Sequence, residues 1–121
     1  MKFYTIMPSG LKPFFKEELQ IAQNHFENQR FEACWHHLER GHILGQSYPI
    51  EHSIAHYEML KFGVKTKNAR EILGQIPRLI FGGVKSFVGD VPIGNTGGAN
   101  VSGGLPMEIP ADLKAILDRY L

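Results

Sequence analysis

Residues 38–60 read LERGHILGQSYPIEHSIAHYEML, and this stretch decides the fold because a helical pattern stands on each side of a turn. Before the turn, Glu39 and His42 are three positions apart. After it, His52 and His56 are four positions apart. Residues at these spacings share one face of a helix. The intervening Gln-Ser-Tyr-Pro is typical of a turn, so the two helices are expected to form an antiparallel hairpin.

The same apolar periodicity extends in both directions and predicts four main helices. We expect the first three near residues 11–26, 28–44 and 50–62. The fourth begins near residue 66 with an apolar face up to Ile80, whereas residues 82–105 show no helical period. Ser9 and Thr66 have side chains that can cap the first and the fourth helix. Pro77 lies inside the fourth pattern, where we expect a kink or a break.

The chain reads as a single helical domain over residues 1–121. Its helical core covers about 10–87, a Gly/Pro-rich tail covers 88–110 and wraps the core, and a terminal helix covers 111–120. Helices joined by short links pack antiparallel in pairs. We therefore expect an all-α fold, a four-helix antiparallel bundle of two tetratricopeptide-like hairpins with an irregular Gly-rich tail.

Composition excludes several classes of protein. Hydrophobic residues make up 43%, charged residues 21%, and the net charge is +1, which excludes a disordered chain and a strongly basic nucleic-acid module. No apolar run approaches ~20 residues, so no membrane span is expected. The start of the chain does not read as a signal peptide, and the single Cys34 suits a reducing, cytoplasmic location.

The histidines are the strongest chemical signal. If the chain reverses around Ser47, His42 and His52 lie at similar height in the hairpin, with Glu39 and His56 one turn deeper. Helix axes ~8–10 Å apart allow imidazoles from both arms to meet one ion. We therefore expect Glu39, His42, His52 and His56 to form a metal site, with Glu39 as fourth ligand or orienting partner.

This donor set suits a divalent transition metal, zinc foremost, with iron, nickel, copper or manganese as alternatives. Storage, sensing or handling of the metal would fit, as would hydrolysis if one coordination position stays open for water. A di-iron site is disfavoured because only one Glu-x-x-His unit is present. Extra ligands or partners are available at Glu58, Glu71 and Gln75.

Three other interpretations remain. The histidines can simply fill the core, as hydrogen-bonded imidazoles often do. The chain can instead be a non-catalytic helical interaction module with a protein partner or a homo-oligomeric state, anchored by Tyr48, Tyr57 and Phe62. It can also be an enzyme that holds a small ligand under the tail, whose residues 94–98 suggest a close backbone crossing.

Several motifs together resemble a bacterial family of unknown function numbered 3703. The first is LERGHILGQ at residues 38–46, where Gly41 replaces the alanine typical of the signature. It is followed by His52-x-x-x-His56 and by GNTGG at residues 94–98. The resemblance covers about residues 14–117 and implies one domain, a bacterial source and a shared design of the Glu/His and Gly-rich segments. It names no reaction.

Overall fold

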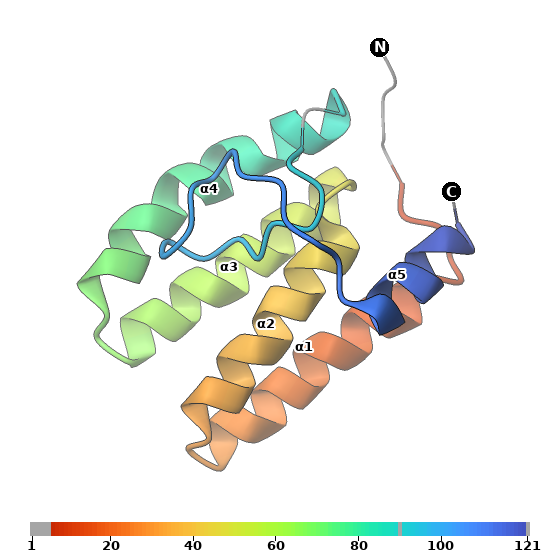
Figure 1. Cartoon of the computed structure of the whole chain (residues 1–121). Helices are drawn as coiled ribbons and strands as arrows, with labels where there is room; N and C mark the ends of the chain where they lie inside the picture. Colours follow the sequence, from red (N-terminus) through yellow and green to blue (C-terminus); the bar gives the residue numbers. More distant parts are fainter. Residues whose placement is uncertain (1–5, 90, 121) are drawn as a thin grey trace.

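The computed structural model describes residues 6–89 and 91–120, and all regular structure within them is helical. The five helices are α1 (Lys12–Glu27), α2 (Phe31–Gly45), α3 (Pro49–Lys65), α4 (Ala69–Phe87) and α5 (Ala111–Asp118). Short turns join the first four helices, so neighbours run antiparallel (Figure 1). The predicted all-α fold, with its long irregular tail and short terminal helix, is confirmed.

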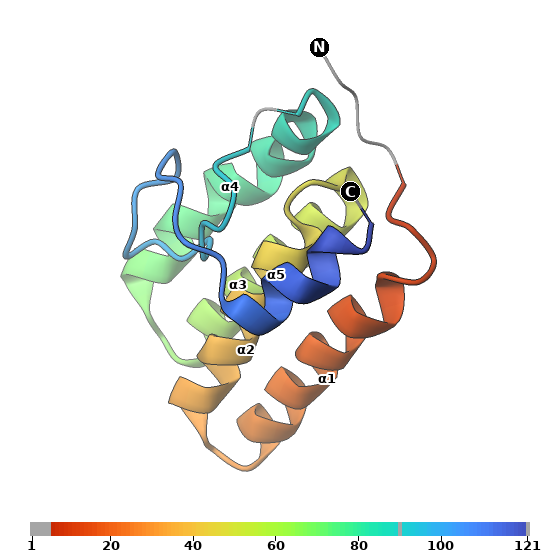
Figure 2. The same cartoon turned by 45° about the vertical axis from the view of Figure 1, so that its right-hand side comes forward.

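The first four helices lie side by side in chain order. α1 packs on α2, α2 on α3, and α3 most extensively on α4, whereas α1 and α4 do not touch within the described residues. The tail crosses one face of this row, and α5 comes to rest on α2 (Figures 1 and 2). A helical bundle built from two hairpins is therefore present, and its tetratricopeptide-like geometry stays a prediction.

Two apolar clusters hold the row together. The larger one joins α1, α2, α3 and α5 through Met7, Leu11, Phe15, Ile43, Leu44, Tyr48, Ala55 and Leu113. The smaller one consists of Ala22, Cys34, Leu38 and Met59. Full burial of a large apolar side chain stabilises a fold by about 1.5–3 kcal/mol. Cys34 belongs to this packing, and burial raises the pKa of its thiol to about 11, as suits a core thiol rather than a nucleophile.

The ends of two helices differ from the sequence-based expectation. Leu11, not Ser9, stands at the N-cap of α1, without a side-chain cap. Asn68, not Thr66, caps α4: its Oδ1 accepts the N–H of Glu71 at 3.1 Å. Thr66 instead donates its hydroxyl to a carbonyl at the end of α3. The Asn side chain is the stronger N-cap, which explains the later start of α4.

Pro77 does not break α4, which continues through it to Phe87. Proline lacks the N–H of one helical hydrogen bond, and the helix that contains it packs along α3. Of the three expected surface anchors, Tyr57 is exposed, whereas Tyr48 is buried and Phe62 is half-buried. Tyr48 and Phe62 therefore belong to the packed interior, because the turn and the α2–α3 contact enclose them.

Candidate metal centre

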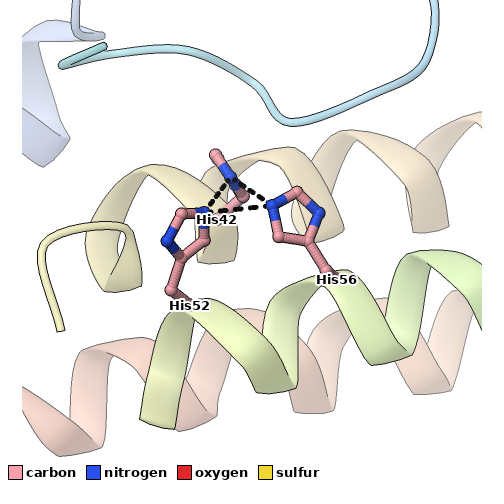
Figure 3. A group of neighbouring side chains, drawn as sticks. All are labelled: His42, His52 and His56. Carbon is pink, nitrogen blue, oxygen red and sulfur yellow. Dashed lines mark hydrogen bonds between the residues drawn. The ribbon is translucent and has the colours of Figure 1, made fainter. Parts of the chain in front are cut away.

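Three imidazoles meet at one point between α2 and α3 (Figure 3). His42 projects from the last turn of α2, and His52 and His56 project from successive turns of α3. The Nε2 atoms of His42 and His52 are 3.2 Å apart, those of His42 and His56 3.1 Å, and those of His52 and His56 3.0 Å. All three side chains are buried, with 3–5% of their surface exposed.

The opposite nitrogen of each ring faces a fixed acceptor. The Nδ1 of His42 is 2.7 Å from the backbone carbonyl oxygen of Asn95. The Nδ1 of His56 is 2.6 Å from Oε1 of Gln75, whose amide nitrogen donates to the carbonyl of Gly97. A carbonyl and an amide oxygen only accept, so both Nδ1 atoms carry the proton.

The tautomer of His52 follows from its serine partner. The Nδ1 of His52 is 2.5 Å from Oγ of Ser86. The Ser86 hydroxyl directs its hydrogen to the carbonyl of Gln46, with the carbonyl of Gly82 also in reach. The hydroxyl oxygen therefore accepts the Nδ1–H of His52. All three Nε2 atoms consequently present a lone pair to one another.

Burial keeps the three rings neutral. It is the main cause that lowers the pKa of His52 to about 3 and that of His56 to about 4, and it lowers the pKa of His42 well below its usual value. The neighbouring imidazoles act in the same direction on His42 and His52. Neutral imidazole is the form that binds a metal, so near pH 7 no proton has to leave before an ion binds.

The spacing of the nitrogens suits a transition metal. Nitrogens ~2.0–2.1 Å from one ion lie ~2.8–3.0 Å apart at right angles and ~3.3–3.4 Å apart at the tetrahedral angle. The observed separations of 3.0, 3.1 and 3.2 Å fall between these limits. The three Nε2 atoms could therefore hold one such ion together, and other groups would supply the rest of its ligands.

A second ring of contacts fixes the tail above the imidazoles. Gln75 is fully buried and also donates to Oε2 of Glu71 at 3.1 Å. The other carboxylate oxygen of Glu71 accepts the backbone N–H of Ala99 at 3.0 Å. The side chain of Asn95 donates to two tail carbonyls and accepts the N–H of Gly97. The tail is thus tied to the partners that orient the rings.

Glycines allow the close approach on both sides of the site. Gly97 has a φ of 85°, and a Cβ there would lie 2.5 Å from Cδ2 of His42. On α4, a Cβ at Gly82 would lie 3.3 Å from atoms of His52 and His56. The close crossing expected for residues 94–98 is therefore present, since their backbone passes directly against an imidazole.

The predicted acidic residue lies outside the cluster. Among the described residues, the ligand atoms within 4.8 Å of one another belong to His42, His52 and His56. Glu39, one turn earlier on α2, is half-buried; burial raises its carboxyl pKa, while the polar groups of Thr96 and Trp35 lower it.

The other candidate acids and amides have distinct places. Gln75 orients His56, and Glu71 holds Gln75 and the tail. Glu58 pairs with Lys61 on the surface of α3.

Ser86 and Asn95 are the site residues that sequence analysis missed. They reach the imidazoles from α4 and from the tail, 34 and 53 residues away in the chain from the histidines they orient. No local pattern in the sequence pointed to either residue; the structure shows that α4 passes close to the rings at Gly82, where a Cβ would lie 3.3 Å from atoms of His52 and His56.

A cavity of about 310 Å³ opens beside the imidazoles. All three histidines line it, together with residues of α4 and of the tail, among them Phe81, Lys85, Pro92, Pro77, Arg78 and Gly103. A ligand in this space would lie next to all three imidazoles. The arrangement can therefore hold an ion and leave room for a further small ligand on it.

The chain matches a known protein family. Among the helices that the structure describes, none has the length and apolar character to cross a membrane. No curated protein and no solved structure matches the chain. A model of the family described as "Protein of unknown function (DUF3703)" matches residues 9–117. With most of its length covered by that match, the chain belongs to the DUF3703 family.

Proposed function

We propose that the protein binds a divalent transition metal through the Nε2 atoms of His42, His52 and His56. One observation carries the proposal: three neutral imidazoles, each with its Nδ1–H held by an acceptor, direct their lone pairs at one another from 3.0–3.2 Å. Such hydrogen bonds to the outer nitrogen are the usual way in which proteins orient metal-binding histidines.

Simple core packing accounts less well for this arrangement. Nitrogens this close normally share a hydrogen bond, but the Nδ1 partners leave no N–H on the inner side. Three facing lone pairs in a buried site repel one another, and a cation between them would turn that repulsion into attraction. Space-filling histidines have no need of this orientation.

Zinc is the metal we propose first, because three imidazoles and an open position suit its tetrahedral preference. Iron, nickel, copper and manganese are the alternatives, since all accept imidazole ligands. The unpaired, buried Cys34 supports a cytoplasmic setting, which stays a prediction. Storage, sensing or handling of the ion are the roles that fit a site with this donor set.

The proposal is tested by elemental analysis of protein purified without a histidine tag. We expect about one equivalent of transition metal per chain, or uptake of about one equivalent of added zinc. The His52→Ala/His56→Ala variant is expected to bind less than about a tenth of that amount. The control, His25→Ala/His36→Ala, removes two histidines outside the cluster and should bind as the wild type does. If the wild type is purified without metal and binds neither added zinc nor added nickel, the proposal is excluded.

Glu39 as fourth ligand also stays a prediction, and the same assay tests it. Glu39→Gln keeps the shape of the side chain and removes its charge. If the carboxylate binds the ion directly, zinc affinity falls by about 10-fold or more. Unchanged affinity would leave the three imidazoles as the protein's complete ligand set.

A further inference from the structure

The cavity beside the imidazoles is positively charged. Arg78 and Lys85 of α4 line it, and no carboxylate belongs to the described residues of its wall. Arg78 donates to the carbonyls of Gly74 at 2.8 Å and Val101 at 3.1 Å, which fixes its guanidinium at the edge of the tail. A guanidinium has five N–H donors, so donors remain for a ligand.

A bound metal would add to this charge. The three neutral imidazoles bring no negative charge to a divalent ion, and the wall of the cavity adds two cations. The Glu71 carboxylate lies behind Gln75, where it accepts hydrogen bonds from that side chain and from the N–H of Ala99. Among the cluster-forming residues that the structure describes, none supplies a negative charge. The electrostatics of the site therefore favour an anion on the ion's open side.

We infer that a small oxyanion, a phosphate or a carboxylate, binds in this cavity and completes the coordination of the ion. This inference rests on the proposed metal site. Oxygen anions are ordinary ligands of zinc and its neighbours, and Arg and Lys side chains recognise the same groups. Phe81 and Pro92 form an apolar part of the wall, against which a carbon-bearing anion would pack.

Cobalt-loaded protein gives a direct test, because cobalt absorption changes when its ligands change. We expect inorganic phosphate or acetate to shift the visible spectrum in a saturable way. The anion that binds with the higher affinity identifies the class of ligand. Lys85→Gln should lower the affinity for that anion by about 2- to 5-fold, the usual effect of removing one exposed charge. Lys16→Gln on α1, remote from the cavity, is the matched control and should leave anion affinity unchanged.

The outcomes separate the two proposals. Cobalt binding with a spectrum that neither anion alters overturns the anion site and leaves the metal site standing. Saturable binding that Lys85→Gln and Lys16→Gln change equally overturns the assignment to this cavity. Failure of cobalt to bind overturns the metal site and the anion site together.

An independent observation concerns the opposite side of the α3–α4 hairpin. Large apolar side chains are exposed along α4 at Leu73, Ile76, Ile80 and Val84, and along α3 at Ile50, Ile54, Tyr57 and Val64. Their spacing of three, four or seven residues places each set in one stripe. The four on α4 are 43–71% exposed. We call these eight residues the apolar face.

The two stripes border one another. Gly83 of α4 lies against Ser53 of α3, which marks the line of contact between the helices. On α4, the residues that face the imidazoles, such as Gly82, lie on one side of this line, and the exposed stripe lies on the other. On α3, His56 likewise lies on one side of Ser53, and the exposed Ile54 lies on the other. The apolar face is therefore continuous and points away from the metal centre.

We infer that the apolar face binds a second copy of this chain. It exposes on the order of 800 Å² of apolar surface, about what each partner contributes to a standard interface and more than the ~300–600 Å² patch of a typical monomer. Lys61 of α3, which lies beside Tyr57 of the apolar face, is paired with Glu58 at 3.1 Å. Two such hairpins face to face would close the row of helices into a four-helix core.

Light scattering on the purified protein tests this inference. We expect a mass of twice the 13.7 kDa of one chain, and Ile80→Glu should convert the dimer to a folded monomer. Ile6→Glu is the control, since Ile6 is 76% exposed outside the apolar face and its replacement should leave the dimer intact. A wild-type monomer, or a dimer that Ile80→Glu does not affect, overturns it.

Discussion

Replacing His52 with leucine is expected to remove all stabilisation by zinc while leaving the metal-free protein at least as stable as the wild type. Zinc at about a thousand times its dissociation constant should stabilise the wild type by about 4 kcal/mol, or roughly 15 °C in Tm. The variant loses one of three ligands and therefore this gain. Without metal, the variant also lacks the Nε2 lone pair of His52, which in the wild type faces those of His56 and His42 at distances of 3.0 and 3.2 Å. Its removal therefore relieves a repulsion.

His52 is the best of the three positions for this experiment. Its partner Ser86 keeps a hydrogen bond to the carbonyl of Gln46 when the imidazole is gone, so no buried donor is left without an acceptor. At His56, by contrast, Oε1 of Gln75 would lose its donor. Thermal unfolding with zinc and with a chelator measures both effects.

His36→Leu is the matched control, because His36 is exposed on α2. Zinc should stabilise this variant as much as it stabilises the wild type. Two results together would show that the histidines only pack the core. Zinc would stabilise neither protein, and in chelator His52→Leu would be less stable than the wild type by about 2 kcal/mol.

The helices were predictable because their signals are local. Apolar residues at helical spacing and the turn before Pro49 placed the α2–α3 hairpin within a few residues of its observed bounds. The ends were harder to predict: Asn68 and Thr66 are two residues apart and both can cap a helix. The local pattern at Pro77 allowed a kink or a break, and it did not decide whether α4 continues through that residue.

The convergence of the imidazoles was predictable for the same reason, since the hairpin alone sets the relative heights of His42, His52 and His56. The partners of their Nδ1 atoms were not, because contacts between segments 19 to 53 residues apart determine them. Helical spacing places Glu39 on the same face as His42, but it does not fix where the carboxylate points. Among the described residues, the ligand atoms within 4.8 Å of one another belong to the three histidines, and Glu39 as a ligand stays a prediction.

Gly97→Ala is expected to destabilise the protein by about 2–4 kcal/mol and to weaken metal binding by about 10- to 100-fold. The backbone at Gly97 has a φ of 85°, which strains any residue with a Cβ, and that atom would lie 2.5 Å from the His42 ring. The tail must then move away from α2. Asn95, two residues earlier, carries the carbonyl that orients His42, so the imidazole loses its fixed direction.

Urea unfolding and zinc titration measure the two effects, and amide hydrogen exchange of residues 94–99 reports whether the tail has lifted from the helices. Gly104→Ala is the matched control, because a Cβ there meets no atom within 4 Å. Its stability should stay within about 0.5 kcal/mol of the wild type or rise slightly, since alanine restricts the unfolded chain. If Gly97→Ala has the same stability and the same zinc affinity as Gly104→Ala, the tail does not hold the metal centre in place. The orientation of His42 must then come from α2 alone.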